Sequence, residues 1–160
     1  MTQKSKKSDQ KLYSEFIRTL ELKHIRLTSC KVESHVSRPQ PRKLQVELDF
    51  GSALVSEPSE GQFEIQTRMT VKFTEKESQK EHAVLESSFV LTYTAEGEIT
   101  PEILDVFIQQ NVPVNAWPYH REFVQSTMQR MEWPSFVLPP FKTSAAPTKK
   151  TRNNRQKTDQ

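Results

Sequence analysis

The chain has 160 residues, of which 34% are hydrophobic, and its formal net charge is +3. A chain of this size can bury one modest core and is too short for two. Its apolar runs are shorter than a membrane span, and its lysine-rich start lacks the apolar segment of a secretory signal, so we expect a soluble, cytoplasmic protein without membrane insertion. The single cysteine, Cys30, excludes an internal disulfide and agrees with a reducing compartment.

The positive charge is concentrated at the two ends of the chain. Residues 1–11 contain four lysines against Asp9, and residues 142–160 contain six lysines and arginines against Asp159, so the ends carry +3 and +5 and the stretch between them −5. Such polar sequence cannot bury enough surface to order itself, which predicts disordered basic tails over residues 1–11 and 142–160 around one domain, residues 12–141. The C-terminal tail has no aromatic residue to stack on bases, so its composition favours a solvated tail over a nucleic-acid contact.

The period of the apolar residues predicts one short helix followed by four strands. Leu12, Phe16 and Leu20 fit a helical lead-in, and residues 21–34 fit a strand with a bulge. Apolar and polar residues then alternate over residues 44–50, and similar alternation returns over 63–73 and 83–93. Alternation of this kind indicates strands with one buried face.

Two helices are expected after the strands. Thr100, Pro101 and Glu102 supply an N-cap, a first-turn proline and an acidic residue, which predicts a helix over Ile103 to Gln110. Pro118 is predicted to start a second helix, which extends to Met131. Strands followed by helices predict an α+β fold, a four-stranded antiparallel sheet with helices on one face. The other face is expected to be wet and to carry Lys43, Glu47, Glu64, Arg68 and Lys72.

A series of aromatic and proline residues marks the C-terminal part of this domain. It consists of Trp117-Pro118-Tyr119, Arg121-Glu122, Trp133-Pro134 and Leu138-Pro139-Pro140. In its order and spacing the series resembles the SecB family of export chaperones, in which an aromatic-Pro-Tyr-x-Arg-Glu motif opens a helix and an aromatic-Pro pair and a Leu-x-Pro segment follow. The resemblance covers the last quarter of the folded part.

The resemblance implies a protein without catalytic activity or cofactor. SecB-like proteins are holdases: without ATP they bind unfolded polypeptides in long grooves, pair as dimers of dimers, and pass clients to the SecA motor through an acidic sheet face for export by the Sec pathway. This chain departs from the family at Met131, where a glycine is expected, and in having a basic tail in place of an apolar C-terminal helix. These departures leave room for a SecB-like chaperone that controls an antitoxin. A nucleic-acid-associated adaptor that uses the basic tails is the alternative from another class.

The same stretch supplies the candidate site residues. We expect the proline-held segment after the second helix to bind client peptides through Trp133, Phe136, Val137, Leu138 and Phe141. A second group is predicted to form an oligomer interface, because one sheet face cannot obviously bury the apolar stripes of two helices. This group consists of Phe123, Val124, Thr127 and Met128.

Catalytic and metal-binding residues are not expected. The four histidines are scattered, without a partner at ligand spacing, and there is no second cysteine for a metal site. Cys30 and His24 lie on one predicted strand, but the strand rise separates them too far for a thiolate and its base. The sequence therefore predicts a binding protein and no enzyme.

Overall fold

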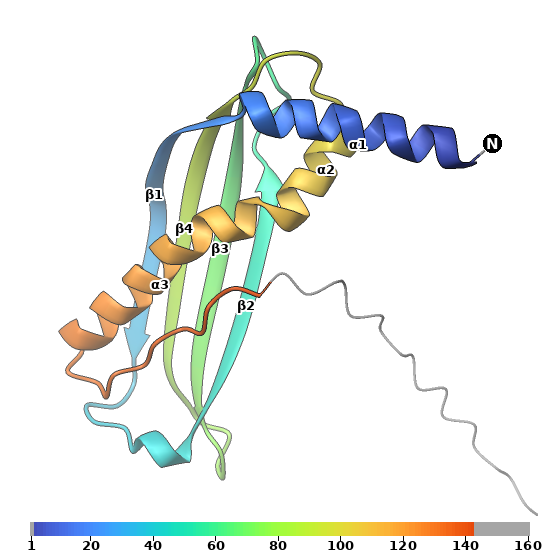
Figure 1. The fold of residues 1–160 in the computed structure, drawn as a ribbon. Helices are drawn as coiled ribbons and strands as arrows, with labels where there is room; N and C mark the ends of the chain where they lie inside the picture. Colours follow the sequence, from blue (N-terminus) through green and yellow to red (C-terminus); the bar gives the residue numbers. More distant parts are fainter. Residues whose placement is uncertain (1, 143–160) are drawn as a thin grey trace, which may run out of the picture.

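The computed structural model describes residues 2–142, with side chains described from Gln10 onward, and consists of one sheet with helices on one face (Figure 1). The chain runs through α1 (Thr2–Thr19), β1 (Glu21–Ser34), a short 3-10 turn η1 (Pro41–Lys43), β2 (Leu44–Leu54), β3 (Gln62–Glu75), β4 (Glu81–Thr94), α2 (Pro101–Gln110) and α3 (Val112–Arg130). Within this part of the chain, no helix is both long and apolar enough to cross a membrane.

The sheet is antiparallel throughout, with the strand order β1-β4-β3-β2. The predicted α+β fold with four antiparallel strands and helices on one face is therefore confirmed. The predicted bulge in β1 is also present, because the register with β4 shifts between Leu22 and His24 and again between Leu27 and Ser29. Since β1 and β2 are both edge strands, the connection between them, residues 35–43, crosses the whole width of the sheet.

The core lies between the sheet and the helices and has two parts. Under α1 and α2, Phe16 packs on Phe63 and Phe107, with ring centroids 6.1 Å and 5.5 Å away. Under the C-terminal half of α3, Met69 and Leu85 of the sheet are buried by helix and strap residues. We use the name strap for residues 132–142, which follow α3 and run back across β3 toward β2 (Figure 1).

The first helix is longer than predicted. The expected lead-in from Leu12 to Leu20 belongs to α1, but α1 begins at Thr2 and includes residues expected to form a disordered tail. The sequence there contains no Gly or Pro, so a helix that is anchored by Phe16 can extend toward the N-terminus at little cost. The predicted C-terminal tail, apart from Lys142, lies outside the described residues.

The last helix begins six residues earlier than predicted. Pro118 does not start α3, which begins at Val112, and the first-turn proline is Pro113. Pro118 lies inside the helix, where it leaves the carbonyl of Val114 without its usual donor. Because Val114 and Pro118 are both exposed, water can satisfy that carbonyl, and the helix continues.

Candidate functional site

A buried histidine fixes the middle of α3 to the sheet. Nδ1 of His120 lies 2.7 Å from Oγ of Ser87 on β4, and Nε2 lies 2.9 Å from Oγ1 of Thr67 on β3. Burial lowers the pKa of His120 to about 4, so the ring is neutral near pH 7. One ring nitrogen of a neutral imidazole donates a hydrogen bond and the other accepts one. One of the two hydroxyls therefore accepts from the ring, and the other donates to it. In the sequence, His120 is one of four scattered histidines and does not stand out, because its two partners are distant along the chain.

The Ser87 and His120 pair has the distance of a nucleophile and its base, but not the access that catalysis requires. His120 is fully buried, and the rings of Phe50 and Phe89 pack edge-on against it at 5.5 Å and 4.8 Å. A nucleophile must reach a substrate. The pair therefore positions α3 on the sheet. In the described residues, no group of three or more His, Cys, Asp or Glu side chains is placed to hold a metal ion.

The strap is held mainly by aromatic side chains. The rings of Trp133 and Phe136 both pack edge-on against Phe73 of β3, with centroids 5.5 Å and 5.4 Å away. The strap backbone is tied to α3 by a hydrogen bond of 2.7 Å that Nε1 of Trp117 donates to the carbonyl oxygen of Pro139. Among the described residues, no backbone–backbone hydrogen bond joins residues 134–142 to the sheet. The strap therefore covers the sheet without becoming a fifth strand.

The five predicted peptide-binding residues are exposed to different degrees. Trp133 and Leu138 are buried in the core, whereas Phe136 and Phe141 are partly exposed and Val137 is 44% exposed. Leu138 is 1% exposed, because this side chain packs against the sheet. Of the five, only the partly and fully exposed residues can touch a ligand directly.

The predicted oligomer-interface stripe faces the chain's own sheet. Val124 and Met128 are 1% and 2% exposed, Thr127 is also buried, and only Phe123 is partly exposed. The sequence argument assumed that one sheet face could not bury both helices. The sheet face does bury the apolar sides of both helices, because α2 covers one end of the sheet and α3 covers the other (Figure 1). These side chains thus have little surface left for a partner.

Each of the two edge strands carries exposed apolar residues that the sequence analysis did not identify as surface. On β2, Val46 and Leu48 stand opposite the buried Phe73 and Val71 of β3, so they lie on the helix-bearing face, yet both are exposed. On β1, the same face carries three exposed apolar side chains, those of Leu22, Leu27 and Val32. Alternation in the sequence identifies this face but not which strands are edges, so these residues could not be recognised as surface.

A hollow of about 380 Å³ lies between the outer side of α3 and the end of the strap. Val114, Pro118 and Gln125 form its helix side, and Pro140 and Phe141 form its strap side. The charged side chains of Arg121 and Glu122 also line it. The Arg121-Glu122 pair of the motif thus borders an open space next to the strap.

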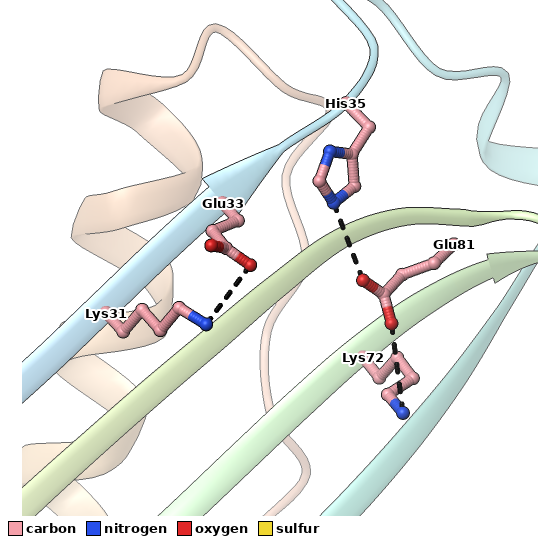
Figure 2. A network of polar contacts seen from close by, with 5 residues as sticks. All are labelled: Lys31, Glu33, His35, Lys72 and Glu81. Atoms are coloured by element: carbon pink, nitrogen blue, oxygen red, sulfur yellow. Dashed lines mark ion pairs between the residues drawn. The ribbon is translucent and has the colours of Figure 1, made fainter.

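The open face of the sheet carries both signs of charge. At one end of it, Glu81 lies between Nε2 of His35, at 3.5 Å, and Nζ of Lys72, at 3.8 Å (Figure 2). Lys31 pairs with Glu33 at 3.2 Å nearby (Figure 2). Each acidic group of this network therefore has a basic neighbour.

The same pattern continues along the face. Glu64 accepts from Oγ1 of Thr92 at 3.0 Å and lies 3.8 Å from Arg26. Glu47 stands opposite Lys72 in the register of β2 and β3. Of the residues predicted for the wet face, Glu47 and Arg68 are exposed on it and Glu64 and Lys72 are partly exposed, whereas Lys43 lies in η1 outside the sheet. This face carries both signs of charge and is not uniformly acidic.

Comparison with known proteins supports the fold assignment. No protein-family description matches the chain, and no curated protein matches it. Among solved structures, the chain is similar to the Rv1957 SecB-like chaperone of Mycobacterium tuberculosis in complex with a ChAD peptide from the Rv1956 HigA1 antitoxin, with a TM-score of 0.74 and 18% identity over 84% of this chain and 99% of that one. A protein of unknown function from Streptococcus agalactiae, with a TM-score of 0.45 and 8% identity over 75% of this chain and 96% of that one, is too dissimilar to carry an argument. The chain thus has the SecB-like fold.

Proposed function

We propose that this protein is a chaperone of the holdase type, which binds non-native polypeptides in an extended form without a nucleotide. The observation that carries this proposal is the exposed apolar surface at the β2 edge. Val46 and Leu48 lie on the helix-bearing face next to an edge that has no neighbouring strand within residues 2–142, and Phe136 packs on Phe73, the cross-strand partner of Val46. An extended client could bind this edge through its main chain and place alternate side chains on the apolar residues.

The proposed client contacts are therefore the exposed part of the strap together with β2. Phe136 and Val137 would contact the client directly, whereas Trp133 and Leu138 support the strap from the core. Each such contact is weak, and several must act together to retain an unfolded chain.

Two fates are open for a bound client, export and antitoxin control. Delivery to the SecA motor would use an acidic sheet face, but on this sheet the acidic side chains of Glu64 and Glu81 are paired with basic ones. The similar Mycobacterium tuberculosis structure contains an antitoxin peptide. We therefore favour an antitoxin segment as the client over an exported preprotein. The basic tails that a nucleic-acid adaptor would use fall mostly outside the described side chains.

We further propose that a second copy of the chain covers the β1 edge. In the part of the chain that the structure describes, the 14 residues of β1 pair with a strand on one side only, and the helix-facing side of β1 exposes Leu22, Leu27 and Val32. An exposed edge with apolar side chains is prone to pair with another strand. In a two-fold contact the same edge is used by both subunits. Replacing Leu27 with Asp should then lower the mass of the particle in light scattering, and an unchanged mass would place the contact elsewhere.

The holdase activity can be tested by light scattering of a chemically unfolded test protein as it is diluted from denaturant. The wild-type chain should suppress aggregation without nucleotide, and the double variant Val46→Asp with Leu48→Asp should not. Val106→Asp is the matched control, because Val106 lies on α2 with 39% exposure, close to the 37% of Val46. Undiminished scattering with excess wild-type chain would contradict holdase activity. If all variants suppressed aggregation equally, the β2 edge would not be part of the client-binding site.

A further inference from the structure

The end of the strap places one aromatic ring in a slot between the sheet and α3. The ring centroid of Phe141 lies 5.2 Å from that of Trp117 and 6.3 Å from that of Phe50, and these two rings are 5.6 Å apart. The rings of Phe50 and Trp117 touch each other, and we call the site that they form together for a third ring the aromatic slot. Phe141 is only partly buried in it, unlike Leu138 three residues earlier.

The contacts that hold this end of the strap are of a kind that any extended polypeptide can make. One is an aromatic ring in the slot, and the other is the hydrogen bond from Nε1 of Trp117 to the main-chain carbonyl of Pro139. Pro139 and Pro140 have no N–H groups to bond to the sheet. A bound segment with its own aromatic residue and carbonyl could therefore replace both contacts.

There is also room for such a segment beside the slot. The hollow of about 380 Å³ between α3 and the strap is bordered by Trp117 as well as by Phe141 itself. Val114, which lines it, is 48% exposed. A ligand in this hollow would thus lie directly against the ring that fills the slot.

We propose that Phe141 is a built-in competitor for the aromatic slot. It fills the slot in the free protein, and an aromatic side chain of an extended client displaces it, while a client carbonyl takes over the hydrogen bond of Trp117. This competition rests on the proposed chaperone function. It assigns to Phe141 a role opposite to that of a client-binding residue, because its removal should strengthen client binding.

The size of the effect follows from how often the slot is free. A ligand that binds only the open state has its affinity reduced by the fraction of molecules in that state, so a slot that is open about one tenth of the time weakens binding about tenfold. Phe141→Ala should remove this penalty. The aromatic ring of Phe136, which packs on Phe73 outside the slot, supplies the matched control Phe136→Ala.

The test is the Kd of a fluorescein-labelled, reduced and carboxymethylated small protein, measured by anisotropy with the full-length chain. We expect Phe141→Ala to lower the Kd by about three- to tenfold and Phe136→Ala, which removes a proposed client contact, to raise it. If wild type binds and Phe141→Ala binds equally or more weakly, the competitor role is overturned and the chaperone function stands. If neither wild type nor any variant binds the probe, the chaperone function fails and the competition fails with it.

A second measurement does not rely on the stability of Phe141→Ala alone, because it also uses a variant that loses less packing. A synthetic peptide with the sequence of residues 134–142 should displace the probe from Phe141→Ala and from the bulkier variant Phe141→Leu more effectively than from wild type. The same peptide with Ala in place of Phe141 is the control and should displace less. Equal displacement by the two peptides would show that no aromatic ring is recognised at the slot and would overturn the proposal.

Discussion

His120 of α3 and Ser87 of β4 are joined by a buried hydrogen bond of 2.7 Å between Nδ1 and Oγ. The opposite ring nitrogen bonds Thr67 of β3, so one imidazole holds the helix to the two central strands. A buried polar group that loses its partner is costly, which makes this histidine a fixed point of the fold. The strap and the aromatic slot lie beside the helix that it positions.

Acidification should destabilise the protein through His120. Burial lowers its folded pKa from 6.5 to about 4. Between these two pKa values the unfolded chain binds more protons than the folded chain. The contribution of neutral His120 to the free energy of unfolding is therefore complete above the unfolded pKa and is lost as the pH falls toward the folded pKa. The free energy of unfolding should drop by about 3 kcal/mol at most from this source. Urea unfolding at about pH 7 and about pH 5 should reveal a smaller drop for His120→Gln than for wild type, and equal drops would contradict the assignment.

Removing the indole N–H of Trp117 should loosen the strap. Trp117→Phe keeps an aromatic ring as one side of the slot but leaves the carbonyl of Pro139 without its donor, which should lower the free energy of unfolding by about 1 kcal/mol. Trp117→Ala removes the ring as well and should cost about 3–5 kcal/mol. Urea unfolding of the two variants separates the bond from the packing. An equal cost for both would mean that the hydrogen bond accounts for the whole effect.

Met128 should behave as a core residue and not as an interface residue. Met128→Ala removes a side chain that is buried against the sheet and should lower the free energy of unfolding by about 2–5 kcal/mol. Val106→Ala on the exposed side of α2 should change it by less than about 0.5 kcal/mol. Thermal unfolding measured at two protein concentrations adds a check. If the cost of Met128→Ala disappeared at low concentration, Met128 would belong to a subunit contact after all.

Glu132, the second residue after the end of α3, should accept glycine. Glu132 has φ 55°, in the left-handed region that follows many helices. Glu132→Gly should keep or raise the melting temperature, whereas the β-branched variant Glu132→Val should lower the free energy of unfolding by about 1 kcal/mol. Glu132→Ala is the intermediate control, since it lacks both the branch and the carboxylate. Equal stability of the Gly and Val variants would show that this backbone conformation is not maintained.

The sequence by itself determined the elements of this fold and the identity of its buried face. Alternation over residues 44–50 and 63–73 places Val46 and Phe73 on one face because the side-chain period of a strand is a local property. Thr100 and Pro101 likewise act as the predicted N-cap and first-turn proline of α2, which begins at Pro101, two residues before the predicted start. The start of α3 was missed because Pro113 and Pro118 carry the same first-turn signal, and only packing decides between them.

Only the tertiary structure decided which apolar residues remain available for binding. Val46 and Phe73 belong to the same apolar pattern, yet Phe73 is buried and Val46 is exposed, because β3 is central and β2 is an edge. In the same way, Leu138 and Phe141 both follow the helix in one apolar segment, but only the first reaches the core. Strand order and strap placement depend on contacts between residues far apart in the chain, which no local period can specify.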